Sequence, residues 1–80
     1  MLIKMRYYGA FGEKTGKATD VIQTQSNNLY ELYRELKTMY SFDLDAEEIL
    51  IAVNNEYQYD LNYVLAANDI VALLPPMSGG

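Results

Sequence analysis

The chain has 80 residues, half of them hydrophobic, and a formal net charge of −5 at pH 7. This length accommodates one small domain with a modest core. The sequence has no cysteine and no histidine, which excludes disulfides, thiol or histidine catalysis and the usual zinc ligands. The negative charge disfavours nucleic acids and anionic membranes as partners and favours a protein with a basic surface. No apolar run is long enough to cross a membrane or to resemble a signal peptide, so a cytoplasmic protein is expected.

Residues 2–8 alternate between apolar and polar side chains, a pattern that predicts a strand with one buried face. Three apolar side chains are expected to face the core: Ile3, Met5 and Tyr7. Lys4, Arg6 and Tyr8 are then expected to face away from it. Residues 9–17 contain three glycines and predict a loop. Residues 18–24 favour a second strand, which is expected to form a hairpin with the first.

An amphipathic helix is the clearest predicted element. Its apolar residues recur at spacings of three and four and are all assigned to the core: Leu29, Leu32, Tyr33, Leu36, Met39 and Tyr40. Asn28 suits the N-cap, because its side-chain oxygen can accept a hydrogen bond from a free N–H of the first turn. Glu31, three residues later, completes a pattern similar to a capping box.

An acidic run follows the helix: Asp43, Asp45, Glu47 and Glu48. Its spacing lacks the central glycine and the closing glutamate of a calcium-binding loop. We therefore expect a solvated loop and no metal site.

Three further strands are predicted in the second half of the chain. Residues 49–53 form an unbroken apolar run, as in the interior of a sheet, and residues 57–59 predict a short edge strand. Asn68 suits a turn that requires a left-handed backbone. Residues 70–74 predict the last strand, which ends at Pro75 because proline cannot donate a ladder hydrogen bond.

The element order predicts a two-layer α+β domain, in which a mixed sheet of four to five strands packs on one main helix. In the last strand, Val71 and Leu73 are expected to face the helix. The outward positions are then Ile70, Ala72 and Leu74. Ile70 and Leu74, together with Tyr8 and Tyr57, predict an exposed apolar patch beside the end of the last strand, and such patches usually mark interfaces.

The chain ends with Pro75-Pro76-Met77-Ser78-Gly79-Gly80. Two stiff residues followed by two very flexible ones predict an extended tail, residues 75–80, on a domain that spans residues 1–74. Six residues reach roughly 20 Å, enough to enter the active site of another protein. We interpret the terminal carboxylate as the functional group of the chain.

These features resemble the small, sulfur-carrying subunit of molybdopterin synthase, a family with the ubiquitin-like β-grasp fold. The resemblance is based on the following residues: Val53-Asn54, Asp69, Val71, Ala72, Pro75-Pro76, Ser78 and Gly79-Gly80. Two positions depart from the family pattern, which commonly has glycine in place of Asn68 and often arginine in place of Gly12. The second departure implies that docking of the activating enzyme is arranged differently here.

The resemblance implies that another enzyme, of the ubiquitin-activating type, uses ATP to adenylate Gly80. Sulfur then replaces AMP, and the resulting thiocarboxylate donates sulfur to cyclic pyranopterin monophosphate in the large catalytic subunit of molybdopterin synthase. Gly79 and Gly80 have no Cβ atom and pass through a narrow tunnel. The residues expected to contact partners are Tyr8, Tyr57, Leu74, Pro75, Pro76, Met77 and Ser78. The chain itself is expected to bind no cofactor and to catalyse nothing alone.

Three other interpretations remain open. The nearest is a β-grasp sulfur carrier for another recipient, such as thiamine thiazole, a transfer RNA base or a cysteine precursor. A non-covalent ubiquitin-like binding module with an inert tail is the second. An enzyme with its own active site is the least favoured, because acid–base chemistry would rest on carboxylates and tyrosines alone.

Overall fold

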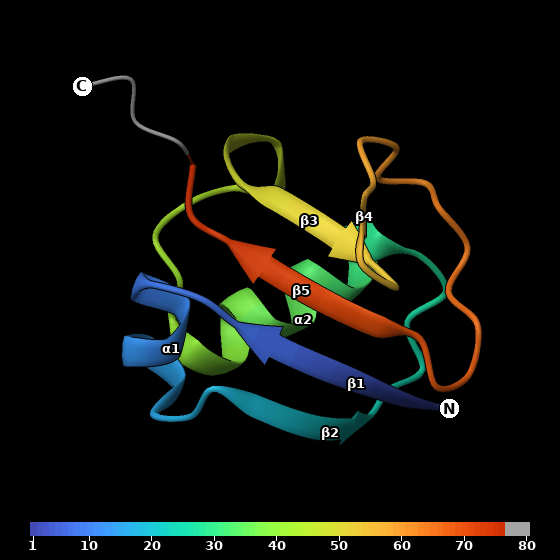
Figure 1. The fold of residues 1–80 in the computed structure, drawn as a ribbon, viewed down its shortest axis with the longest axis horizontal. Helices are drawn as coiled ribbons and strands as arrows, with labels where there is room; N and C mark the ends of the chain where they lie inside the picture. The colour runs from blue at the N-terminus through green and yellow to red at the C-terminus, as the bar shows by residue number, and fades with distance from the viewer. Residues whose placement is uncertain (77–80) are drawn as a thin grey trace.

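The computed structural model describes residues 1–76 of the chain (Figure 1). Its elements, in chain order, are β1 (Leu2–Tyr7), α1 (Ala10–Thr15), β2 (Thr19–Gln23), α2 (Leu29–Tyr40), the short 3-10 helix η1 (Ala46–Glu48), β3 (Leu50–Val53), β4 (Glu56–Tyr57) and β5 (Ile70–Leu74). Of the tail, only Pro75 and Pro76 are described. The predicted roles of Met77, Ser78, Gly79 and Gly80 lie outside the described residues.

The strands form one five-stranded mixed sheet in the order β2-β1-β5-β3-β4. β1 pairs with β2 antiparallel and with β5 parallel, and β3 is antiparallel to both β5 and β4. Helix α2 lies across one face of this sheet (Figure 1). The predicted α+β class, the pairing of the first two strands and the interior position of β3 are therefore confirmed.

The core lies between α2 and the inward face of the sheet. The alternation predicted for β1 and β5 is confirmed, because Ile3, Met5, Val71 and Leu73 are almost fully buried. The helix contributes its own buried residues: Leu29, Leu32, Tyr33 and Leu36. Burial of these apolar side chains is the main stabilising contribution to a domain of this size.

The start of α2 is capped as predicted. The Asn28 side chain accepts a hydrogen bond from the backbone N–H of Glu31 at 2.9 Å. In return, the Glu31 carboxylate accepts from the backbone N–H of Asn27, one residue before the cap, at 2.8 Å. These two bonds fix where the helix begins.

The prediction of a loop at residues 9–17 is wrong, because residues Ala10–Thr15 form the short helix α1. Phe11 is buried, and its ring packs edge-on against Phe42 with centroids 4.9 Å apart. Gly16 ends the helix in the left-handed conformation and donates its N–H to the carbonyl of Gly12. Gly9 and Gly16 therefore mark the boundaries of a helix that the burial of one aromatic side chain stabilises.

The assignment of Met39 to the core is also wrong, because its side chain is 59% exposed. At 3.6 residues per turn, Met39 lies at the margin of the apolar stripe of α2. Tyr40, beside it, is half-buried, and its ring lies 6.3 Å from that of Tyr7.

Two asparagines shape the loops at one end of β3 and β5. Asn68 has φ +70°, which confirms the predicted left-handed turn. The Asn54 side chain donates to the carboxylate of the buried Asp69 at 3.0 Å and accepts from the backbone N–H of Ile70 at 2.9 Å. These bonds tie the loop after β3 to the start of β5. The edge strand β4 is Glu56–Tyr57 rather than the predicted 57–59.

The acidic run is partly structured. Asp45 and Glu48 form a capping box around the single turn of η1, where a simple loop was expected. Asp45 also pairs with Lys37 of α2, and Asp43 lies 3.7 Å from Lys14. Within residues 1–76 no three acidic side chains gather to hold a metal ion, and no helix of that range has the length and hydrophobicity to span a membrane.

Two buried tyrosines are expected to respond oppositely to loss of the hydroxyl. The Tyr33 hydroxyl donates to the Leu44 carbonyl at 2.7 Å, whereas the buried Tyr7 hydroxyl has no partner among the described residues. Tyr33→Phe should lower the free energy of unfolding by about 1 kcal/mol, and Tyr7→Phe should raise it by a similar amount. Urea denaturation of both variants measures this, and equal destabilisation by both would contradict it.

The same tyrosines predict a loss of stability in alkali. Burial raises the pKa of Tyr33 to about 12 and raises the pKa of Tyr7 well above its usual value. Since an exposed tyrosine in the unfolded chain ionises near 10, the contribution of these two residues to stability should be constant below about pH 10 and fall as the pH rises above 10 towards the folded pKa values. Melting temperatures between pH 8 and 11 test this. A Tyr7→Phe, Tyr33→Phe double variant should lose less stability over that range, and a parallel loss would count against the assignment.

Candidate functional site

A shallow groove of about 230 Å³ lies on the sheet face that α2 does not cover. Strands β1, β5, β3 and β4 form its floor. It is lined by Arg6, Tyr8, Ala52, Asn55, Tyr57, Ile70, Ala72 and Leu74. The strand register explains this gathering, because Arg6 and Ala52 both lie opposite Ala72 and Ala52 lies opposite Tyr57. We call this surface the outer groove.

The structure thus brings together the side chains predicted from strand parity. Tyr8 and Tyr57 are 46% and 56% exposed, and Ile70 and Leu74 are half-buried. Ala72 also faces outward but is only 9% exposed, because it lies on the central strand of the sheet, between Arg6 and Ala52. Ala52 and Asn55 were not predicted, since only long-range pairing places them beside β5.

The root of the tail adjoins the outer groove. Leu74, the last residue of β5, pairs with Leu50 of β3. Pro75 follows and is half-buried, whereas Pro76 is exposed. Pro75 lines a small apolar pocket together with Phe11 and Phe42, so its ring rests on the helix side of the domain. Because Leu74, the residue before Pro75, lines the outer groove, a protein that receives the tail would lie close to that groove.

Gly9 holds the first proline of the tail in place. Its φ is +54°, and a Cβ atom added there would lie 2.9 Å from Cγ of Pro75. The contact exists because β1 and β5 are parallel, so the residues that follow both strands lie side by side. Only glycine combines this backbone conformation with so close a neighbour.

Gly9→Ala is expected to redirect the tail root, whereas Gly16→Ala provides a matched control. Gly16 also has positive φ, at +76°, but nothing lies within 4 Å of its missing Cβ. Gly16→Ala should lose about 1 kcal/mol of stability from its left-handed backbone, and Gly9→Ala should lose more, because its backbone (φ +54°, ψ −129°) lies outside the left-handed helical region and its Cβ meets Pro75. Only Gly9→Ala should also reduce kcat/KM for modification of the C-terminus by a partner enzyme, by roughly tenfold. Equal rates for the two variants would show that the Pro75 contact does not orient the tail.

The chemistry of the outer groove is that of a binding surface. Its lining residues offer two phenol rings, aliphatic side chains, one amide and one guanidinium group, but no carboxylate and no activated nucleophile. Tyrosine and arginine are the residue types that contribute most to protein interfaces. The groove is therefore suited to contact another protein rather than to catalyse a reaction.

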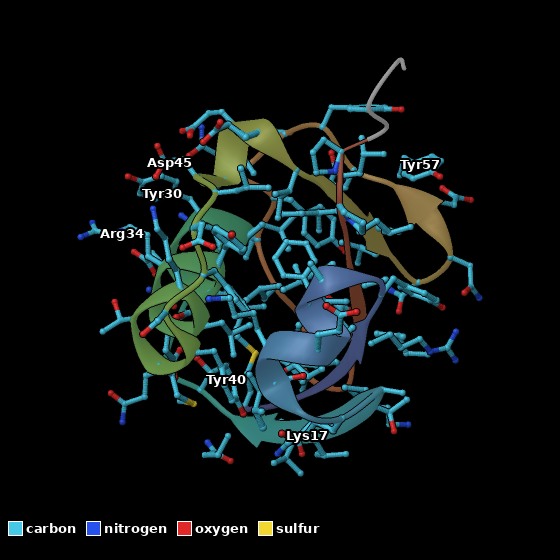
Figure 2. The ribbon with its side chains drawn as sticks, turned by 90° about the vertical axis from the view of Figure 1, so that its left-hand side faces the viewer. Lys17, Tyr30, Arg34, Tyr40, Asp45 and Tyr57 are labelled. Carbon is cyan, nitrogen blue, oxygen red and sulfur yellow. The ribbon has the colours of Figure 1, made fainter. Side chains whose placement is uncertain are left out.

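A second, larger groove of about 590 Å³ lies between α2 and η1. Tyr30, Arg34 and Asp45 border it, on the side of the molecule opposite Tyr57 (Figure 2). Its charged groups include both signs, and Lys37 and Asp45 pair with each other. This groove is remote from the outer groove.

Solved structures with the same architecture define the class of fold. A putative molybdopterin converting factor subunit 1 from Pyrococcus furiosus is 22% identical and matches 96% of this chain and 99% of its own, with a TM-score of 0.81. SAMP1 from Haloferax volcanii is 21% identical over 100% of both chains, with a TM-score of 0.79. In the complex of subunits 1 and 2 of molybdopterin-converting factor from Helicobacter pylori, the similar chain is 28% identical over 100% of both chains, with a TM-score of 0.70. The fold is the ubiquitin-like β-grasp, as predicted.

The sequence itself shows the family. The profile of the ThiS family matches residues 5–80, nearly the entire chain and including its last glycines. The chain belongs to the ThiS family of ubiquitin-like sulfur carriers. No sequence among curated proteins matches it significantly.

Proposed function

We propose that this chain is the sulfur-carrying small subunit of a molybdopterin synthase. The observation that supports this most directly is the position of the tail root, Leu74 and Pro75, beside an exposed apolar groove in a ThiS-family chain that ends in Gly79-Gly80. The Helicobacter pylori structure, a complex of subunits 1 and 2 of molybdopterin-converting factor, supports the choice of pathway. Such carriers are non-catalytic members of their complexes.

The proposed reaction uses the main chain of Gly80. Its carboxylate is a poor electrophile at neutral pH, because it is ionised. An activating enzyme of the ubiquitin-activating type joins it to the α-phosphate of ATP and releases pyrophosphate. A sulfur donor then displaces AMP and leaves a C-terminal thiocarboxylate. In the large catalytic subunit this group donates its sulfur to cyclic pyranopterin monophosphate, and two such transfers complete the dithiolene.

The residues of the chain have supporting roles in this cycle. Tyr8, Tyr57 and Leu74 contact the large subunit through the outer groove. Pro75 and Pro76 keep the tail extended, which reduces the entropy lost when it is threaded into a partner. Met77 and Ser78 contact the wall of the partner's tunnel, and Gly79 lets the backbone approach the nucleotide. ATP is bound by the activating enzyme, and the cycle takes place in the cytoplasm.

Transfer to the pterin distinguishes this proposal from sulfur delivery to another recipient. The thiocarboxylated chain is mixed with a molybdopterin synthase large subunit and cyclic pyranopterin monophosphate, and the products are followed by mass spectrometry. We expect loss of sulfur from the chain and formation of molybdopterin. If the pterin is unchanged while transfer RNA, a thiazole precursor or a cysteine precursor receives the sulfur, the pathway proposed here is wrong.

A further inference from the structure

The outward face of the sheet differs in charge from the rest of the chain. The strand registers place thirteen outward side chains on this face: Leu2, Lys4, Arg6, Thr19, Val21, Gln23, Leu50, Ala52, Tyr57, Ile70, Ala72 and Leu74 on the strands, with Tyr8 following β1. None of them is acidic, although the sequence has 11 aspartates and glutamates and a net charge of −5. The only charged groups at these positions are Lys4 and Arg6.

Neither of these two cations has an acidic partner within residues 1–76. The ion pairs of that part of the chain involve three other lysines, Lys14, Lys17 and Lys37. Arg6 is half-buried and lines the outer groove between the apolar side chains, and with Lys4 it also borders the adjoining hollow over β2. The guanidinium group therefore lies within the surface that a partner would cover.

Covering an unpaired cation is energetically costly. If a purely apolar surface closed over the outer groove, the Arg6 guanidinium would lose water without gaining a counter-ion. A carboxylate on the partner compensates for this, and the planar guanidinium of arginine can bind it through two hydrogen bonds. The chemistry of the face thus specifies the chemistry of the partner surface.

We propose that the protein that docks on the outer groove presents an apolar surface with a carboxylate opposite Arg6 and a second acidic group near Lys4. This inference rests on the proposed function, and we assign that surface to the large subunit of molybdopterin synthase. It reverses the expectation from net charge, which favoured a basic partner. The net charge is a poor guide to the partner here, because no acidic residue occupies an outward strand position of this face, and Asp20, which borders the adjoining hollow, pairs with Lys17.

A nucleic acid is a less suitable occupant of this face than a protein. Phosphates occur along the whole length of a nucleic acid strand, whereas this face offers only two cations, Lys4 and Arg6, on a chain with a net charge of −5. The apolar side chains of Ile70 and Leu74 also offer nothing to a phosphate backbone. Two cations in an apolar setting match a protein surface with a few carboxylates.

Charge reversal at Arg6 tests the proposal, with Arg34 as the matched control. Arg34 is exposed on α2, on the side of the molecule opposite Tyr57 (Figure 2), and Arg34→Glu changes the net charge by the same amount. We expect Arg6→Glu to weaken binding of the large subunit 10- to 100-fold, Arg6→Met to weaken it less, and Arg34→Glu to change it less than about twofold. Wild-type affinity should also fall as salt increases. Equal effects of Arg6→Glu and Arg34→Glu, or tight binding of transfer RNA to the wild-type face, would overturn the proposal.

A carbodiimide cross-link identifies the acidic group near Lys4 directly. This reagent joins a lysine amine to a carboxylate in contact with it, so the complex should yield a covalent link between Lys4 and an aspartate or glutamate of the large subunit. Replacing that acidic residue by lysine should restore binding of a Lys4→Glu variant. Links only through Lys14 or Lys37 would contradict the proposal. Conversion of wild-type Gly80 to a thiocarboxylate is measured separately, so failure of this inference is distinguishable from failure of the proposed function.

Discussion

Removal of Gly80 is expected to abolish formation of the thiocarboxylate. The deletion withdraws the reacting carbon by about 3.5 Å, the length of one extended residue, from the nucleotide of the activating enzyme. Because misplacement of a reacting group by even 1 Å is costly, conversion should fall at least 100-fold. The hydrogen bonds and core described above join residues within 1–76, so the melting temperature should be unchanged.

Two further variants make this result specific. Addition of one alanine after Gly80 removes the free carboxylate from its position and should be equally inactive. Ser78→Ala leaves both glycines and the length of the tail unchanged, so conversion to the thiocarboxylate should fall less than tenfold. Normal conversion of the shortened chain would show that the terminal glycine is not the reacting residue.

Leu74→Glu is expected to weaken binding of the large subunit by about 100-fold. The side chain is half-buried in the outer groove at the tail root, where the partner must pass to receive the tail. The variant removes an apolar contact and places a negative charge opposite a surface that we infer to be acidic. Central contacts of this kind contribute about 2–3 kcal/mol to binding, or roughly 100-fold in affinity.

Met39→Glu is the control for Leu74→Glu. Met39 is exposed on α2, which covers the other face of the sheet, and it receives the same change from an apolar to an acidic side chain. The affinity of the Met39→Glu variant for the large subunit should match that of the wild type in calorimetric titration. Should Leu74→Glu fold less stably, Tyr57→Ser at the exposed edge strand offers a second variant, with an expected loss of about tenfold. Unchanged affinity in both groove variants would place the interface elsewhere.

The parts of the fold that could be predicted depend on local rules. The spacing of Leu29, Leu32 and Leu36 predicts α2. Its start is predictable because the Asn28 cap bonds a residue only three positions later. Alternation along β1 and β5 predicts which side chains face outward, because side-chain direction in a strand depends only on parity. These rules were enough to place Tyr8 and Leu74 on one face.

The remaining features depend on contacts between residues far apart in the sequence. Helix α1 is stabilised by the packing of Phe11 on Phe42, a contact between distant residues. The sequence of this segment has three glycines and therefore predicts a loop instead. The contact of Gly9 with Pro75 requires the parallel pairing of β1 and β5. The outward strand positions carry no acidic residue, and this can be recognised only when the pairing of all five strands is known. The net charge of −5 alone predicts a basic partner, whereas the outward face favours an acidic one.

The proposed function requires that the main-chain carboxylate of Gly80 accepts sulfur. The most direct measurement is the intact mass of the chain after incubation with its activating enzyme, ATP and a sulfur donor. We expect the mass to increase by the difference between sulfur and oxygen, with fragmentation placing the change on Gly80 and with no change when ATP is omitted. An unaltered mass with an activating enzyme that converts its other carriers, or sulfur found on any residue other than Gly80, would contradict the claim.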